Sequence, residues 1–193
     1  ICYLNGIIAG VGNNKFDPEG QITGAQLAKM CLVVLGYDQT KAGLVGVNWL
    51  TNTMSLAFEN KMFDDYGADV AAAAPREDAA VLFYNTIFTP TVVYRDDVYT
   101  NKNVLGNDNP TVGSTNFNLT EYTGVLVAAQ GFVVPNEDSA GDPIVTGAAD
   151  DEIKLIDVEI NGTAVDATAT LDYEEGKDML GQTGKGIAFH HAG

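Results

Sequence analysis

Apolar residues recur at helical spacing near the start of the chain, most clearly in the segment 22–36. Five of them stand at i, i+3, i+4, i+7 and i+8 and so share one helix face: Leu27, Met30, Cys31, Val34 and Leu35. Thr23 is a suitable N-cap, Gln26 completes a capping box, and Gly36 suits the left-handed residue that ends many helices. The pattern predicts an amphipathic helix that packs on a neighbouring element.

Two further helices are predicted downstream. One spans about 48–60, with an apolar stripe made of Leu50, Met54, Ala57 and Phe58. The other begins at Pro75, carries Glu77 and Asp78 near its positive end, and stops before Pro90. Its apolar stripe consists of Ala80, Phe83, Tyr84 and Ile87.

These helices belong to an internal repeat. Residues 22–30 align with residues 74–82, which lie 52 positions later, and residues 4–10 align with residues 59–65. Residues 1–10 have the pattern of the end of a helix. Each unit is then a helix, a short turn, a loop and a capped helix. Such periods indicate stacked units that cannot bury their apolar faces alone.

The composition changes at about residue 91, where Val, Thr, Gly, Asn and Asp replace the Ala- and Leu-rich pattern. Residues 123–131 predict a strand, and residues 153–172 predict a hairpin that turns at Asn161–Gly162. Residues 136–149 are rich in turn formers and acids, which is typical of a surface loop.

We therefore predict an α+β chain with two domains. An all-α repeat domain covers 1–90, with units at 1–38 and 43–88, and a β-rich domain of sandwich or barrel type covers 91–193. The chain opens as if within a helix and closes near a strand, so we expect both ends to be cuts through a larger protein. The β-rich domain is then incomplete at its C-terminus, and the missing signal peptide is uninformative.

The charge balance limits the classes of partner. Among 193 residues there are 26 acidic and 10 basic side chains, which gives a net charge of −16. This argues against nucleic-acid binding, because contact with phosphates requires clustered cations. No apolar run approaches the roughly 18 residues that a membrane span requires. An anionic ligand therefore requires a place on this acidic surface where positive charge is concentrated.

Few patterns indicate catalysis or a cofactor, and we expect neither an enzyme nor a bound cofactor. The loop GVGNN lacks the lysine, the Ser/Thr and the preceding strand of a phosphate-binding loop. His190 and His191 have no acid or nucleophile at a motif spacing. The acidic pairs that offer candidate Ca²⁺ ligands are Asp64–Asp65, Asp96–Asp97 and Asp150–Asp151. Cys2 and Cys31 stand among apolar neighbours and are expected to be buried free thiols.

Residues 4–38 resemble an S-layer homology (SLH) repeat that lacks most of its first helix. The family pattern is a G-I-x-x-G turn, a glycine-rich loop ending in F-x-P, and an I-T-R-A-E helix start that leads to L-G. The matching residues are Gly6, Ile7, Gly10, Gly12, Phe16, Pro18, Ile22, Thr23, Ala25, Leu35 and Gly36. A more divergent second repeat spans about residues 43–88 and includes Trp49 and the segment PREDAAVLFYNTIF.

The resemblance implies an extracellular protein of the bacterial cell surface. Three such repeats commonly form a bundle that holds an S-layer protein or enzyme to an anionic, often pyruvylated, secondary cell-wall polysaccharide. The strand-rich remainder is then what the anchor carries. An alternative is a self-assembling subunit of an array or filament, in which the repeats contact other copies of the chain instead of sugar.

The candidate ligand-binding residues are Arg76, Glu77, Trp49, Gly10, Gly12, Asn13 and Lys15. The Arg76 guanidinium at a helix start can hold a carboxylate bidentately, or it can form a surface ion pair. Trp49 can stack on a sugar ring or pack within the bundle. Gly10 and Gly12 can let a sugar approach the backbone, or they can simply turn the chain.

The helix start at Thr23 is also expected to direct its positive end at an acidic substituent. Asn13 and Lys15 in the preceding loop can donate hydrogen bonds to a sugar, although an exposed lysine is usually only solvated. The chain departs from the family at Gly24, where the family has arginine, and at Gln26, where it has an acid. These departures weaken the case for sugar binding in the first groove and favour the alternative.

Overall fold

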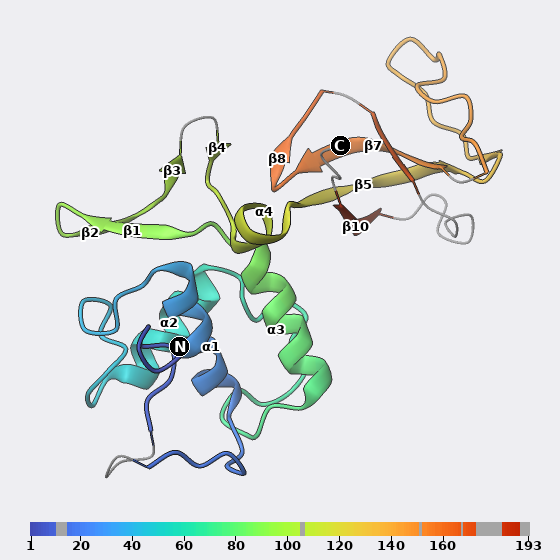
Figure 1. The fold of residues 1–193 in the computed structure, drawn as a ribbon. Helices are drawn as coiled ribbons and strands as arrows, with labels where there is room; N and C mark the ends of the chain where they lie inside the picture. Colours follow the sequence, from blue (N-terminus) through green and yellow to red (C-terminus); the bar gives the residue numbers. More distant parts are fainter. Residues whose placement is uncertain (11–14, 105–106, 151, 167, 173–182, 190–193) are drawn as a thin grey trace. The chain divides into compact units, whose positions relative to one another are not determined.

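The structure is a computed structural model that describes residues 1–10, 15–104, 107–150, 152–166, 168–172 and 183–189. It divides into two compact units, Ile1–Phe117 and Asn118–Gly193. Helices and antiparallel strands are both present, so the expected α+β class is confirmed (Figure 1). The division falls later in the chain than the change of composition near residue 91.

The first unit contains the helices α1 (Gly24–Leu35), α2 (Trp49–Glu59), α3 (Arg76–Phe88) and α4 (Val112–Phe117). The expected capping box of α1 is present: the Gln26 amide donates to Thr23 Oγ1 at 3.2 Å, and the Thr23 amide donates to Gln26 Oε1 at 2.9 Å. Gly36 ends α1 with a φ of 112°. The first three helices therefore begin and end where the pattern predicts, with Pro75 serving as the N-cap of α3.

The repeat is visible in the way the first helix of each unit ends. Gly6 has a φ of 69°, and the Ile7 amide donates to the Cys2 carbonyl at 2.9 Å. At the aligned position after α2, Lys61 has a φ of 55°, and the Met62 amide donates to the Ala57 carbonyl at 2.9 Å. Both segments close with the hydrogen bond from C″ to C3 of a Schellman motif, so residues 1–7, which the structure describes as turns, end in the same way as α2.

The core of the first unit is built around α1, which packs against both α2 and α3 (Figure 1). Its buried residues are Leu27, Ala28, Cys31, Leu32, Leu35, Tyr37, Leu44, Ala57, Met62, Phe63, Leu82 and Val92. The stripe predicted for α1 is buried except for Val34, which is exposed, and Met30, which is half-buried.

The stripes predicted for the other two helices are wrong in part. On α2 the buried residues are Thr53 and Ala57, whereas Leu50 and Phe58 are exposed. On α3 the buried residues are Leu82 and Thr86. The physical reason is that each of these helices meets α1 along a face rotated from its most apolar one, so small or hydroxylated side chains take the central positions.

A hairpin of β1 (Val92–Arg95) and β2 (Val98–Asn101) also belongs to the first unit. Val92 is buried in the same core as α1. The Tyr99 ring lies 4.7 Å from the Tyr37 ring, and its hydroxyl accepts a hydrogen bond from the Asp38 amide at 3.0 Å. The short strands β3 (Asn103–Val104) and β4 (Asn107–Asp108) follow. This packing explains why the first unit extends beyond the helical repeats.

The second unit is one antiparallel sheet of six strands with the order β10-β5-β7-β8, while β6 pairs with β5 and β9 with β7. The strands are β5 (Leu119–Ala129), β6 (Phe132–Val133), β7 (Glu152–Ile160), β8 (Thr163–Ala164), β9 (Ala169–Asp172) and β10 (Thr183–Phe189). The predicted strand and hairpin are confirmed, and the turn at Asn161–Gly162 has φ angles of 50° and 74°.

The segment 136–149 is more than the expected surface loop. Asn136 is buried, and its side-chain amide donates to the carbonyls of Val134 and Val145 at 2.8 and 3.0 Å. The Val145 amide donates back to Asn136 Oδ1 at 2.6 Å. Val145 packs with Val127 of β5, so this segment covers one face of the sheet.

The two thiols differ in exposure, which corrects the expectation that both are buried. Cys31 is buried and Cys2 is exposed, and both are free. Burial raises the pKa of the Cys31 thiol to about 11, partly offset by a hydrogen bond with Thr86. Cys31 therefore stays protonated near neutral pH, and thiolates are the reactive form of cysteine.

We expect iodoacetamide to modify Cys2 alone in the native protein, and Cys31 only after unfolding. Mass spectrometry of the peptides that contain each cysteine measures this directly. Equal labelling of both thiols in the native protein would show that the core around α1 is open.

Candidate functional site

The start of α1 is closed by the second repeat. The amides of Gly24 and Ala25 donate to the carbonyls of Ala72 and Val70 at 3.4 and 2.9 Å. The next two amides, of Gln26 and Leu27, bond to the side chain and carbonyl of Thr23. The Leu27 bond is the first within the helix, and the Thr23 amide donates to Gln26 Oε1, so all four amides that a helix leaves unsatisfied at its start, those of residues 23–26, are occupied. The expectation that this helix end receives an acidic substituent is wrong, because protein groups already take its donors.

Gly24 is required by this closed arrangement. A Cβ at position 24 would lie 2.6 Å from the Tyr66 hydroxyl and 3.1 Å from the Val70 Cα. The Tyr66 hydroxyl is buried and has no hydrogen-bond partner among the described residues. Burial raises the pKa of Tyr66, and the carboxylates of Asp78 and Asp69 raise it further. The place that the family gives to an arginine is thus filled by Tyr66.

Substituting this glycine tests the packing. We expect Gly24→Ala to lower the free energy of unfolding of the first unit by about 1–2 kcal/mol, because Tyr66 and Val70 have to move to admit a methyl group. The only tryptophan, Trp49, lies in this unit, so urea unfolding followed by its fluorescence reports the change. Gly67→Ala is the control in the same unit: its added carbon meets only Asp78 Oδ1, at 3.4 Å, so it should change stability little.

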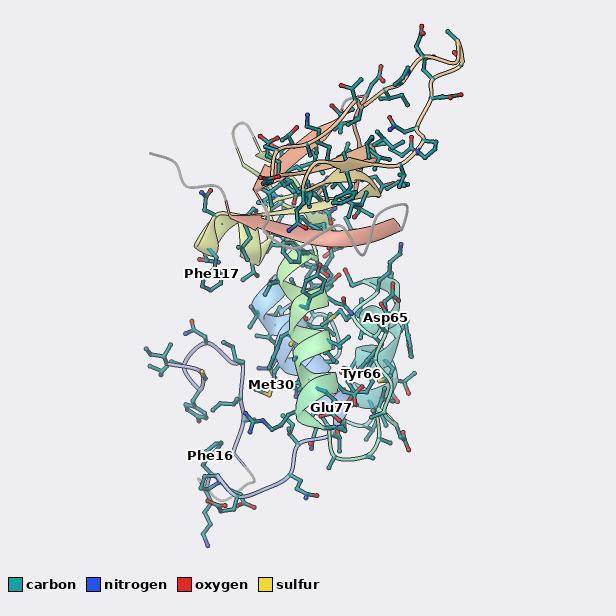
Figure 2. All side chains as sticks on the ribbon, turned by 90° about the vertical axis from the view of Figure 1, so that its right-hand side faces the viewer. Phe16, Met30, Asp65, Tyr66, Glu77 and Phe117 are labelled. Carbon is teal, nitrogen blue, oxygen red and sulfur yellow. The ribbon has the colours of Figure 1, made fainter. Side chains whose placement is uncertain are left out.

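The start of α3 is open by contrast. Arg76 and Glu77 are both exposed, and Figure 2 shows Glu77 at the end of α3 that faces away from α4. Among the described residues, the amides of Arg76, Glu77 and Asp78 have no acceptor, and Arg76 has no ion-pair partner. The Asp78 side chain does not cap these amides, because its Oδ1 accepts hydrogen bonds from the amides of Gly67 and Ala68 at 2.6 and 3.3 Å. Free amides, a helix dipole and a guanidinium therefore meet at one exposed place.

The loop before α1 supplies less than the pattern suggests. A Cβ at Gly10 would lie 2.3 Å from the Lys15 carbonyl, so this glycine lets two parts of the loop approach each other. Lys15 is exposed, as is Phe16, which Figure 2 shows in the loop away from the helices. Gly12 and Asn13 lie outside the described residues.

Trp49 is half-buried at the start of α2 and pairs with a residue that the sequence did not indicate. Lys29 Nζ lies 5.7 Å from the centre of its ring, which is within cation–π range. Burial lowers the pKa of Lys29. Lys29 is the only charged residue of α1, and a single charge on an otherwise uncharged helix is the sequence signal that could have identified it as a candidate site residue. No contact among the described residues joins the pair to Arg76.

Metal binding and membrane crossing were also examined in the described residues. In this part of the chain no three His, Cys, Asp or Glu side chains are placed to hold one metal ion. Asp151, His190 and His191 lie outside it. None of the described helices has both the length and the apolar character of a membrane span.

The family model of the S-layer homology domain matches residues 2–28, which lie in the first repeat. The predicted resemblance is therefore confirmed for this segment: the protein contains S-layer homology sequence, and the match associates it with the cell surface and cell wall. No curated protein and no solved structure matches the chain.

Proposed function

We propose that the first unit anchors this protein to the cell wall outside the cell by binding an anionic secondary polysaccharide, and that the second unit is part of what is anchored. The match of residues 2–28 to the S-layer homology family carries the proposal. The helices α1, α2 and α3 are then the end of one repeat and the whole of the next, within a bundle of such repeats. The protein acts by binding, not by catalysis.

The open start of α3 is the proposed binding place. Arg76 holds the carboxylate of an acidic substituent, such as a pyruvyl group, and the free amides of the first turn bind the same oxygens. Glu77 accepts hydrogen bonds from sugar hydroxyls. Arg76 has no ion pair within the part of the chain that the structure describes, so it can provide the local positive charge that an anionic ligand requires on a chain of net charge −16. The Lys29–Trp49 pair is a second place where a sugar ring can stack.

Binding to wall fragments tests the proposal. We expect the intact chain to sediment with purified cell-wall sacculi that keep their secondary polysaccharide, and to stay in solution with sacculi from which acid treatment has removed it. Equal sedimentation with both preparations, or with neither, would contradict polysaccharide anchoring. Added salt should weaken the binding, because its main contact is between exposed charges.

A further inference from the structure

The loop between β6 and β7 contains the bond Asp142–Pro143, one of two Asp–Pro bonds in the chain. Such a bond breaks more easily in mild acid than other peptide bonds, for two reasons. The aspartate carboxylate can attack its own main-chain carbonyl through a five-membered ring, and the tertiary amide nitrogen of proline leaves readily once protonated. Both residues are exposed, and Figure 1 shows the loop in orange, extending beyond the ends of β5 and β7.

The main-chain carbonyl of Asp142 is held by a hydrogen-bond donor. The Asp138 amide donates to its oxygen at 2.9 Å, and on the other side of the Asp–Pro bond the Ile144 amide donates to the Asn136 carbonyl at 3.2 Å. The two bonds fix the peptide bond that lies between them. A donor already placed at a carbonyl oxygen stabilises the negative charge that develops there when the carbonyl carbon is attacked.

The two carboxylates of the loop have different surroundings. Asp138 Oδ1 accepts hydrogen bonds from the amides of Ala140 and Asp142 at 2.8 and 3.0 Å. The backbone amides of Asp142 and Ala140 thereby lower the pKa of Asp138, so this acceptor stays ionised in mild acid and keeps the turn closed. The Asp142 carboxylate has no hydrogen bond or ion pair among the described residues, so it is free to turn toward its own carbonyl carbon.

The other Asp–Pro bond, Asp17–Pro18, lacks this arrangement. The donor nearest to the Asp17 carbonyl oxygen among the described residues is the Gly20 amide, at 3.4 Å. The Asp17 carboxylate is also engaged, since its Oδ1 accepts from the Glu19 amide at 3.3 Å. The chain therefore contains its own comparison: the same two residue types, without a short bond to the carbonyl and without a free carboxylate.

We propose that the chain cleaves itself at Asp142–Pro143. A carboxylate oxygen of Asp142 bonds to the Asp142 main-chain carbonyl carbon, and the carbonyl electron pair moves onto the oxygen that the Asp138 amide holds. The Pro143 nitrogen takes a proton from the solvent, the carbonyl re-forms, and the C–N bond breaks with its electron pair going to nitrogen. One water molecule then opens the cyclic anhydride left at Asp142 and returns a proton. The net reaction is hydrolysis, and each chain reacts once.

The sheet is expected to hold the two products together. The strand β5 belongs to the piece 1–142, and it lies between β10 and β7, which belong to the piece 143–193. Backbone hydrogen bonds therefore join the pieces on both sides of β5. Cleavage converts a covalent connection into a non-covalent joint without releasing either piece. The proposal goes beyond wall binding and does not depend on it, because the loop belongs to the second unit.

Incubation of the intact chain near pH 5 tests the proposal, since protons are available there while ordinary aspartates are still largely ionised. Denaturing electrophoresis and mass spectrometry of the intact products measure the rate and the position of the cut. We expect the pieces 1–142 and 143–193 to appear at least tenfold faster than products of cleavage at Asp17–Pro18. The two pieces should elute together in size-exclusion chromatography without denaturant.

Three variants locate the chemistry. Asp142→Asn removes the attacking carboxylate and Pro143→Ala restores an ordinary amide, so both should leave this bond intact. Asp138→Ala removes the acceptor that closes the turn, and it should slow cleavage here at least tenfold without changing the rate at Asp17–Pro18. Glu137→Ala is the matched control, because Glu137 is an exposed acid beside Asp138 whose side chain accepts no hydrogen bond from the described residues.

Several outcomes would overturn the proposal. A chain that stays whole is one, and equal rates at the two Asp–Pro bonds are another. An equal rate at Asp142–Pro143 in the native and the urea-unfolded chain would show ordinary acid lability that owes nothing to the fold. Normal cleavage of Asp138→Ala would show that the turn does not assist. None of these outcomes bears on sedimentation with sacculi, which is measured separately.

Discussion

Gly36→Ala is expected to lower the free energy of unfolding of the first unit by about 3–4 kcal/mol. Gly36 ends α1 with a φ of 112°, a conformation that costs a residue with a Cβ about 1–2 kcal/mol. The added carbon would also lie 2.4 Å from the Val92 carbonyl, which is backbone and cannot turn away. Overpacking of this kind costs about 1–3 kcal/mol more. The substitution would separate α1 from the β1–β2 hairpin.

Urea unfolding followed by Trp49 fluorescence measures the loss in the first unit without contribution from the second. Gly46→Ala is the matched control: Gly46 also has a positive φ, 78°, but nothing lies within 4 Å of the added carbon. It should cost only about 1 kcal/mol, the conformational part of the effect. Equal losses for the two variants would show that the hairpin is not held against the end of α1.

Arg76→Ala is expected to weaken binding to the cell-wall polysaccharide at least tenfold. A charge-assisted bidentate contact contributes about 1.5–3 kcal/mol, and Arg76 supplies the only side-chain cation at the start of α3. Because Arg76 is exposed and without an ion pair among the described residues, its removal should leave the stability of the unit nearly unchanged. Isothermal titration with solubilised polysaccharide measures the affinity.

Arg95→Ala is the control for the loss of one positive charge, because Arg95 is also exposed but lies at the end of β1. It should bind the polysaccharide as the unchanged chain does. If Arg95→Ala weakens binding as much as Arg76→Ala, the interaction depends on net charge and not on the start of α3.

The sequence predicted those features that local chemistry determines. Thr23, Gln26 and Gly36 mark the ends of α1 through caps that involve only neighbouring residues, and the turn at Asn161 depends on its own backbone preference. The internal repeat could also be recognised in the sequence, because residues 4–10 align with residues 59–65 and residues 22–30 align with residues 74–82. These elements appear in the structure at the expected positions.

The remaining features depend on contacts between distant segments. The closure of the α1 start by Val70 and Ala72 cannot be seen from the capping pattern, which shows only that the helix begins there. The buried face of α3 follows from where α1 lies, not from the spacing of its own apolar residues. Val92 joins the helical core although the composition around it indicates the start of a strand domain. For the candidate site, the sequence offered Arg76 as a ligand-binding residue. It did not show that the amides at the start of α1 are hydrogen-bonded while those at the start of α3 are free.

The account depends on the start of α3, and not that of α1, being the place that receives an acidic sugar. Titration of the isotope-labelled chain with a soluble pyruvylated fragment of the polysaccharide, followed by amide chemical shifts, tests this residue by residue. The predicted result is that the largest shifts fall on the amides of Arg76, Glu77 and Asp78. Largest shifts at Gly24 and Ala25, or no shifts in the first unit, would contradict it.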